Sequence, residues 1–223
     1  MRKFMAVPMA GLMVVAIAAP VLAGPNVSNT SGTGRSIYGE WSGDGTYGYV
    51  FAGEESNYGG FADIYQEAGE WVLCESGTPA PVDKDEPTPK DTTPGDEVYG
   101  FVGTRTYGYA TELHLTLSRR LEMGTATGTA ELYTETIDEC AGVYGGDPVS
   151  ETVALNVTAT GVGPLASFRG SGSYKIPSEF NGHQNYRGTE RQATGSVDAG
   201  SAINATFTFG YMNQVTWTEH INS

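Results

Sequence analysis

The chain has 223 residues, with 26 Asp and Glu against 12 Lys and Arg and a formal net charge of −14 at pH 7. Proteins bind phosphate backbones through Lys and Arg that release counterions, so this excess of acid argues against nucleic acid and anionic lipid as partners. The electrostatic field of this negative net charge favours solubility and attracts cationic partners. The length suffices for one sizeable core, and one main domain is expected.

Residues 1–23 have the pattern of a secretory signal peptide. Arg2 and Lys3 precede an apolar run, Met9–Ala19, and small residues lead to a cleavage position before Gly24. Because the run is shorter than the roughly 20 residues of a membrane helix, we predict cleavage and no stable membrane span. The product is expected to be extracytoplasmic, either secreted or periplasmic.

Residues 24–36, GPNVSNTSGTGRS, lack apolar periodicity and are predicted to form a flexible lead-in. Residues 37–223 are predicted to form a single β domain, because apolar and polar side chains alternate with a period of two. The alternation is clear at 111–118 (TELHLTLS), 151–160 (ETVALNVTAT) and 201–212 (SAINATFTFGYM). Gly-rich and Pro-rich turn signals separate such runs, including one at EFNGHQNYRG.

The predicted fold is all-β with little or no helix. No window of about eleven residues sustains the three- and four-residue spacing of an amphipathic helix without an intruding Gly or Thr. Counting the alternating runs gives roughly 9–11 strands, and their short connections require antiparallel pairing. An antiparallel β-sandwich and a closed β-barrel both satisfy these constraints.

The segment 75–97 interrupts the alternation with five prolines, seven acidic residues and no aromatic residue. Such a composition cannot build a core, so we predict an acidic, Pro-rich loop within the domain. The spacing of its acids lacks the central Gly and alternating ligands of a calcium loop.

Cys74 and Cys140 are the two cysteines of the chain. An even pair in an exported protein is most simply a disulfide, which is our prediction. Neither cysteine belongs to a CxxC motif and no His lies at ligand spacing from either, so no metal site is expected.

The pentapeptide TYGYV recurs sixty residues later as TYGYA. Residues two apart on a strand share a face, so Tyr47 and Tyr49 are predicted to lie side by side, as are Tyr107 and Tyr109. In one interpretation these rings pack in the core and their hydroxyl groups reach solvent at its edge. The other makes them a platform for a ligand such as a glycan, and the four tyrosines are our candidate binding residues.

The similarity around these tyrosines extends from residues 37–49 to residues 98–109. Each copy is followed by a cysteine. We therefore expect that residues 37–74 and 98–140 form related units that superpose strand for strand.

The sequence gives little sign of catalysis, and we expect no cofactor. It contains neither a GxSxG motif nor a free-cysteine signature. The three histidines are far apart: His114 is predicted on a strand opposite a leucine face, His183 in a polar loop and His220 near the C-terminus. Glu131 and Glu135 share a strand face at roughly 13 Å, beyond the roughly 5–9 Å of a glycosidase pair. The catalytic residues of any enzymatic activity are therefore unknown.

These observations favour a secreted, non-enzymatic β module that binds a glycan or another extracellular ligand, such as a protein. Two alternatives stay open. One is a secreted hydrolase, and the other is an outer-membrane β-barrel, whose alternation and Tyr and Gly content the chain shares.

Overall fold

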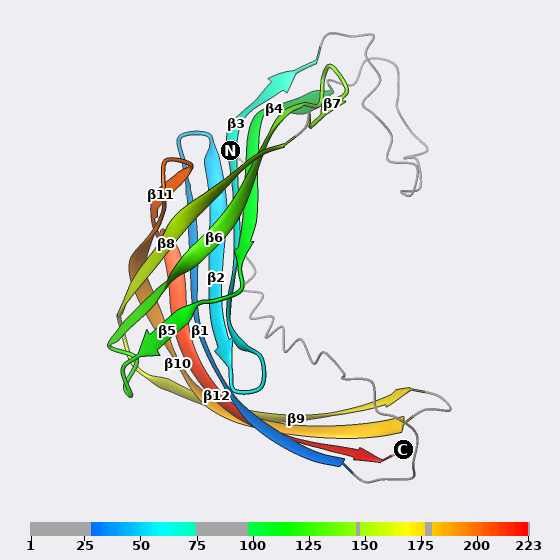
Figure 1. The fold of residues 1–223 in the computed structure, drawn as a ribbon, viewed down its shortest axis with the longest axis vertical. Coiled ribbons are helices and arrows are strands. Elements are labelled where there is room, and N and C mark those ends of the chain that lie inside the picture. The colour runs from blue at the N-terminus through cyan, green and yellow to red at the C-terminus, as the bar shows by residue number, and fades with distance from the viewer. Residues whose placement is uncertain (1–27, 75–97, 146–147, 177–179, 223) are drawn as a thin grey trace.

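A computed structural model describes residues 28–74, 98–145, 148–176 and 180–222 (Figure 1). This part of the chain contains twelve antiparallel strands and no helix, which confirms the predicted fold class. The predicted signal peptide and the acidic loop at 75–97 lie outside the described residues. The strands are β1 (Ser28–Gly43), β2 (Thr46–Glu55), β3 (Gly59–Leu73), β4 (Tyr99–Ala110), β5 (His114–Leu117), β6 (Met123–Asp138), β7 (Val143–Tyr144), β8 (Val149–Gly161), β9 (Ala166–Ile176), β10 (Phe180–Ala199), β11 (Ile203–Thr206) and β12 (Phe209–Asn222).

Eight of these strands close into a barrel. β1, β2, β3, β4, β6, β8, β10 and β12 each pair with the next, and β12 pairs back with β1. β8 completes the ring because one of its edges pairs with β6 and the other with β10. Of the two predicted architectures, the structure therefore has the closed barrel, with strands that run up and down in chain order.

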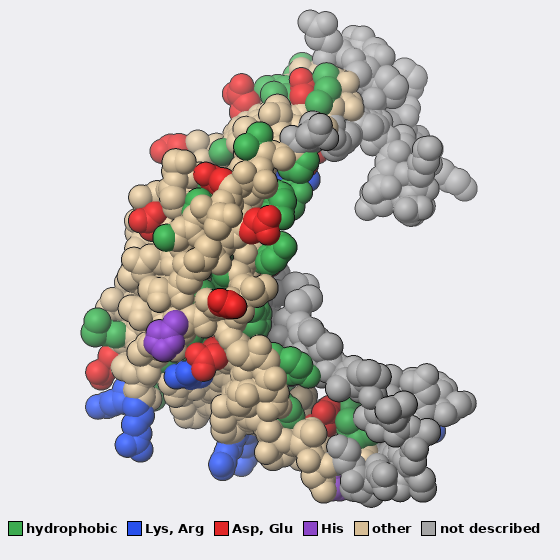
Figure 2. Space-filling model, in the orientation of Figure 1, with side chains coloured by type: hydrophobic (Ala, Val, Ile, Leu, Met, Phe, Trp, Pro, Cys, Tyr) green, Lys and Arg blue, Asp and Glu red, His purple; other side chains and the backbone are tan. Residues whose placement is uncertain are grey.

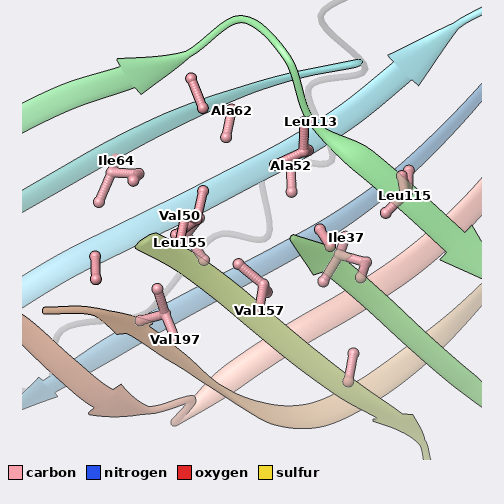
Figure 3. Packing of buried hydrophobic residues seen from close by; sticks show 14 of the residues in the cluster. Ile37, Val50, Ala52, Ala62, Ile64, Leu113, Leu115, Leu155, Val157 and Val197 are labelled. Atoms are coloured by element: carbon pink, nitrogen blue, oxygen red, sulfur yellow. The ribbon is translucent and has the colours of Figure 1, made fainter. Parts of the chain in front are cut away.

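The interior of the ring is apolar. Side chains that alternate along each strand point inward, and Ile37, Val50, Ile64, Leu155 and Val157 are almost completely buried there (Figure 3). Burying one such side chain is worth about 1.5–3 kcal/mol relative to leaving it in water. The inward faces predicted for 111–118 and 151–160 are confirmed by the burial of alternate residues in β5 and β8.

Four strands continue beyond one end of the ring as an extension, formed by β9, β10, β12 and the start of β1. β9 pairs with the first half of β10, while β8 pairs with its second half. With this extension at one end and β3, β4 and β7 at the other, the molecule is bent, and its concave side lies at the right in Figure 1.

The extension corrects two sequence predictions. Ser28–Ser36 was expected in the flexible lead-in but belongs to β1, where it pairs with β12 from Ser28 onward. The loop expected around His183 is part of β10, paired with β9 and β12. In both segments the backbone hydrogen bonds of neighbouring strands are satisfied without an apolar side-chain pattern, because the extension lies beyond the core.

The predicted disulfide is confirmed between Cys74 and Cys140, whose Cα atoms are 5.2 Å apart. Cys74 follows β3 and Cys140 follows β6, so the bridge crosses β4, which runs between them. A Cβ atom on Gly100 of β4 would lie 2.8 Å from one sulfur and 2.9 Å from the other. Glycine at this position leaves room for the bridge.

The predicted internal repeat is wrong. Residues 37–49 form a hairpin from β1 into β2, whereas 98–109 run into the single strand β4. Asp44 and Gly45 both have positive φ angles, 50° and 73°, as a tight hairpin turn requires. The second copy has Thr104 and Arg105 in place of this pair, and it stays extended.

The Tyr-Gly-Tyr motif that the two strands share has a local cause. Gly48 and Gly108 both point into the barrel, where added Cβ atoms would lie 2.5 Å from the Trp41 ring and 2.6 Å from Leu132 Cδ2. A larger residue would overpack the core at either position. In both strands the glycine therefore points into the barrel, and the tyrosines on either side of it point outward.

Candidate functional site

Tyrosine side chains form a belt across the outer surface of the ring. The cross-strand register places Tyr38 opposite Tyr211, and it places Tyr65 opposite Tyr49 on one side and Tyr107 on the other. Each residue alternates along its strand with an inward apolar or glycine position, so the row faces outward. The tyrosine belt consists of Tyr211, Tyr38, Tyr49, Tyr65, Tyr107 and Tyr133, from strands β12, β1, β2, β3, β4 and β6.

The four tyrosines predicted as binding residues all lie on this outer surface. Tyr49 and Tyr107 belong to the belt, and Tyr47 and Tyr109 flank it, two positions away on the same strands. The interpretation that packs them in the core is wrong, because Tyr47, Tyr107 and Tyr109 are 42%, 37% and 50% exposed. Figure 2 shows hydrophobic side chains along the concave edge of the molecule.

Neighbouring rings of the belt are stacked. Tyr38 and Tyr211 have ring centroids 5.1 Å apart, Tyr49 and Tyr65 5.6 Å, and in each pair the ring planes lie within 26° of parallel. This is offset stacking, in which neighbouring faces partly cover each other. Within the described residues, Tyr47 and Tyr109 have no stacked neighbour, and both side chains are exposed.

Carboxylates alternate with the tyrosines and accept hydrogen bonds from their hydroxyl groups. The hydroxyl of Tyr38 donates to Glu40 at 3.0 Å, that of Tyr49 to Asp63 at 3.1 Å, and that of Tyr65 to Glu67. Further along, Tyr109 donates to Glu131 at 3.4 Å, and Arg105 binds Glu67 at 3.1 Å and Glu135 at 3.4 Å. We call the belt, its two flanking tyrosines and these carboxylates the aromatic–acidic face. It consists of Tyr38, Tyr47, Tyr49, Tyr65, Tyr107, Tyr109, Tyr133, Tyr211, Glu40, Asp63, Glu67, Glu131 and Glu135.

Burial and then the neighbouring Asp63 raise the pKa of Tyr49 to about 12. Its folded pKa thus lies above the unfolded value of about 10, so its contribution to stability is present below pH 10 and is lost as pH rises towards 12. We expect the difference in unfolding free energy between wild type and Tyr49→Phe to be constant between about pH 7 and 9 and to shrink above about pH 10. Urea unfolding across this range measures it, and a constant difference up to pH 12 would contradict the assignment.

Of the histidines and acids weighed as catalytic candidates, the structure brings His183 and His220 together, while His114, Glu131 and Glu135 lie on other strands. His183 lies opposite His220 in the extension, and its Nδ1 is 2.9 Å from the Ser173 hydroxyl oxygen. His114 is exposed on β5, opposite the buried leucines, as predicted. The residues described by the structure contain no group of three or more His, Cys, Asp or Glu positioned to hold a metal ion.

Four belt residues were missed from the sequence: Tyr38, Tyr65, Tyr133 and Tyr211. Each occupies an outward position beside an inward apolar one, as in the pairs Ile37–Tyr38 and Leu132–Tyr133. That alternation was a usable signal for Tyr38, Tyr65 and Tyr133. In 201–212 it would place Tyr211 on the side of the buried Ile203 and Phe207, but the break between β11 and β12 reverses the faces. Alternation carries no information on the register between strands. That register is what brings tyrosines of six strands into one row.

The fold and site together define an antiparallel up-and-down β-barrel with an aromatic and acidic outer face. Comparison of the chain with protein-family models, curated proteins and solved structures gives no match. None of the described residues forms a helix with the length and apolar character needed to cross a membrane.

Proposed function

We propose that this protein is an extracytoplasmic, non-enzymatic β module that binds a glycan on its aromatic–acidic face. The observation that carries the proposal is the row of tyrosines across six hydrogen-bonded strands, flanked by the exposed, unstacked rings of Tyr47 and Tyr109. Strands of a closed ring hold such rings in place, so little conformational entropy is lost when a ligand binds.

The composition of the face restricts the glycan. Aromatic ring faces pack against the apolar C–H surface of a sugar, while carboxylates accept hydrogen bonds from its hydroxyl groups. Asp63 and Glu131 lie on either side of Tyr109 in the register, and Glu67 lies beside Tyr47. Because these acids would repel sulfate or uronate groups, the proposed ligand is a neutral or amino-sugar glycan.

The extracytoplasmic assignment is supported by the disulfide between Cys74 and Cys140. Disulfides persist in oxidising compartments and are rare in the cytosol. The sequence pattern of residues 1–23 agrees with export.

Tyr47→Ala and Tyr109→Ala are each expected to weaken glycan binding by about tenfold, the equivalent of about 1.4 kcal/mol from one lost aromatic contact. Calorimetric titration of cello-oligosaccharides and chitosan oligomers measures the effect, with a sulfated oligosaccharide as the anionic comparison. Both side chains are exposed, so the variants should fold, and circular dichroism checks this.

Tyr58→Ala is the matched control, because Tyr58 is 55% exposed but lies in the turn between β2 and β3, away from the belt. It should bind as wild type does. Equal affinity of all three variants, or preference for the sulfated oligosaccharide, would overturn the proposed site.

A further inference from the structure

An open hollow of about 960 Å³ lies where the ring ends and the extension begins. Its lining combines Arg35 and Glu54, just beyond the apolar interior, with Arg169 and Arg187 from the extension. Gln214 of β12 also lines it. The hollow is separate from the aromatic–acidic face, since its side chains share the face that continues the barrel interior.

Cations gather at this end of an otherwise acidic molecule. Of the basic residues that the structure describes, Arg105 alone lies on the aromatic–acidic face, and the others belong to the extension, the adjoining end of the ring or its turn at 118–122. In Figure 2 most of the blue side chains lie towards the lower end, whereas red ones are spread over the whole visible face. Glu54, Glu55, Glu190 and Glu219 also lie at this end but are fewer than its cations, so an anion is repelled less here than over the rest of the described surface.

Two arginines of the hollow lie directly opposite each other. Arg187 of β10 is the register partner of Arg169 of β9, so their side chains leave the sheet on the same face. Within the described residues neither makes an ion pair, and Arg187 has only a 3.4 Å hydrogen bond to the Thr216 hydroxyl. Like charges directly opposite each other destabilise a sheet.

The third arginine is already neutralised. Arg35 pairs with Glu54 at 2.6 Å, which leaves Arg169 and Arg187 as the uncompensated charges of the lining. Two positive charges match one phosphate monoester, which carries about −1.5 to −2 at neutral pH. Planar guanidinium groups also match the oxygen geometry of phosphate, with two parallel hydrogen bonds each.

We propose that this hollow binds the phosphate group of a small ligand, held between the guanidinium groups of Arg169 and Arg187. Thr189, which also lines the hollow, supplies a hydroxyl donor beside them, while the Thr216 hydroxyl accepts from Arg187 Nε and donates to the Arg187 carbonyl. The bound phosphate removes the repulsion between the two arginines, so binding and the stability of the extension are coupled.

The test titrates the full chain with inorganic phosphate and glucose 6-phosphate, with glucose as the uncharged comparison. NMR spectroscopy and thermal unfolding follow binding. Wild type should bind both phosphates, not glucose, and unfold at a higher temperature when they are present. Arg187→Gln and Arg169→Gln should each weaken binding by about tenfold or more, the loss of a charge-assisted hydrogen bond.

Arg119→Gln is the matched control, because it removes the same charge from an exposed side chain in the turn at 118–122. It should retain binding. Without phosphate, Arg187→Gln should unfold at the same temperature as wild type or higher, since repulsion is relieved; this separates loss of the site from loss of the fold.

Vesicles of phosphatidylcholine with and without phosphatidic acid distinguish the source of the phosphate. Sedimentation that depends on phosphatidic acid and on Arg187 would assign the phosphate to a lipid headgroup, whereas binding of the soluble phosphates alone assigns it to a small molecule. Wild type that binds no phosphate, or Arg187→Gln and Arg119→Gln that bind equally well, would overturn the proposal.

Discussion

Replacing both cysteines, Cys74→Ser together with Cys140→Ser, is expected to lower the free energy of unfolding by up to about 4 kcal/mol. The bridge joins residues 66 apart in sequence, and closing a loop of that length restricts the unfolded chain by this amount in the loop-entropy model. Typical domains are stable by about 5–15 kcal/mol, so the loss would be a large share of the total. Urea unfolding under non-reducing conditions measures it.

Wild type treated with a reductant serves as the control for this double variant. Both samples lack the bridge, so they should unfold at the same urea concentration, and the variant should not respond to reductant. The ends of β3 and β6 should lose most protection in hydrogen exchange, because the bridge fastens them across β4. A double variant as stable as oxidised wild type would contradict the assignment of this stability to the disulfide.

The period of two was the most informative signal in the sequence, and its success has a simple cause. Where one side of a strand faces a core, as in β8, inward Leu155 and Val157 must alternate with outward polar residues. The same signal fails beyond the core. Ser28–Ser36 and the segment around His183 carry polar residues on both sides, yet both are strands, because hydrogen bonds to β12 satisfy their backbones.

The candidate site shows a second limit of the sequence. Alternation showed that Tyr47 shares a face with Tyr49, and Tyr109 with Tyr107. It did not show whether that face points into the core or towards solvent. Inward glycines decide it: the Trp41 ring occupies the space above Gly48, and the Leu132 side chain occupies that above Gly108. The Trp41–Gly48 contact crosses the hairpin between β1 and β2, whereas the Gly108–Leu132 contact joins β4 to β6 and depends on a register that short-range patterns do not encode.

The two proposed sites differ in charge, and on the strands that they share, β1, β2 and β12, they lie on different faces. Tyr38 faces outward on β1 within the aromatic–acidic face, while Arg35, three residues earlier, faces the hollow. Odd spacing along a strand puts the two side chains on opposite faces. Substitutions in one site should therefore leave binding at the other unchanged, because sites on opposite faces share no ligand contacts.

Leu155→Ala is expected to cost about 2–5 kcal/mol of unfolding free energy, the usual range for a leucine removed from a packed interior. Leu155 is 2% exposed and lies on β8, the strand that closes the ring between β6 and β10. The cavity would open among residues of both neighbours, since Leu155 pairs with Gly128 on β6 and with Ala199 on β10. Urea unfolding measures the loss.

Leu165→Ala is the matched control for this substitution. Leu165 follows β8 in the connection to β9 and is 41% exposed, so the same truncation should change the unfolding free energy by about 0.5 kcal/mol or less. Hydrogen exchange in Leu155→Ala should increase on both β6 and β10, because β8 bonds to each of them. Increased exchange on only one of these strands would contradict the closed ring. It would mean that β8 pairs with one neighbour and that the sheet is open.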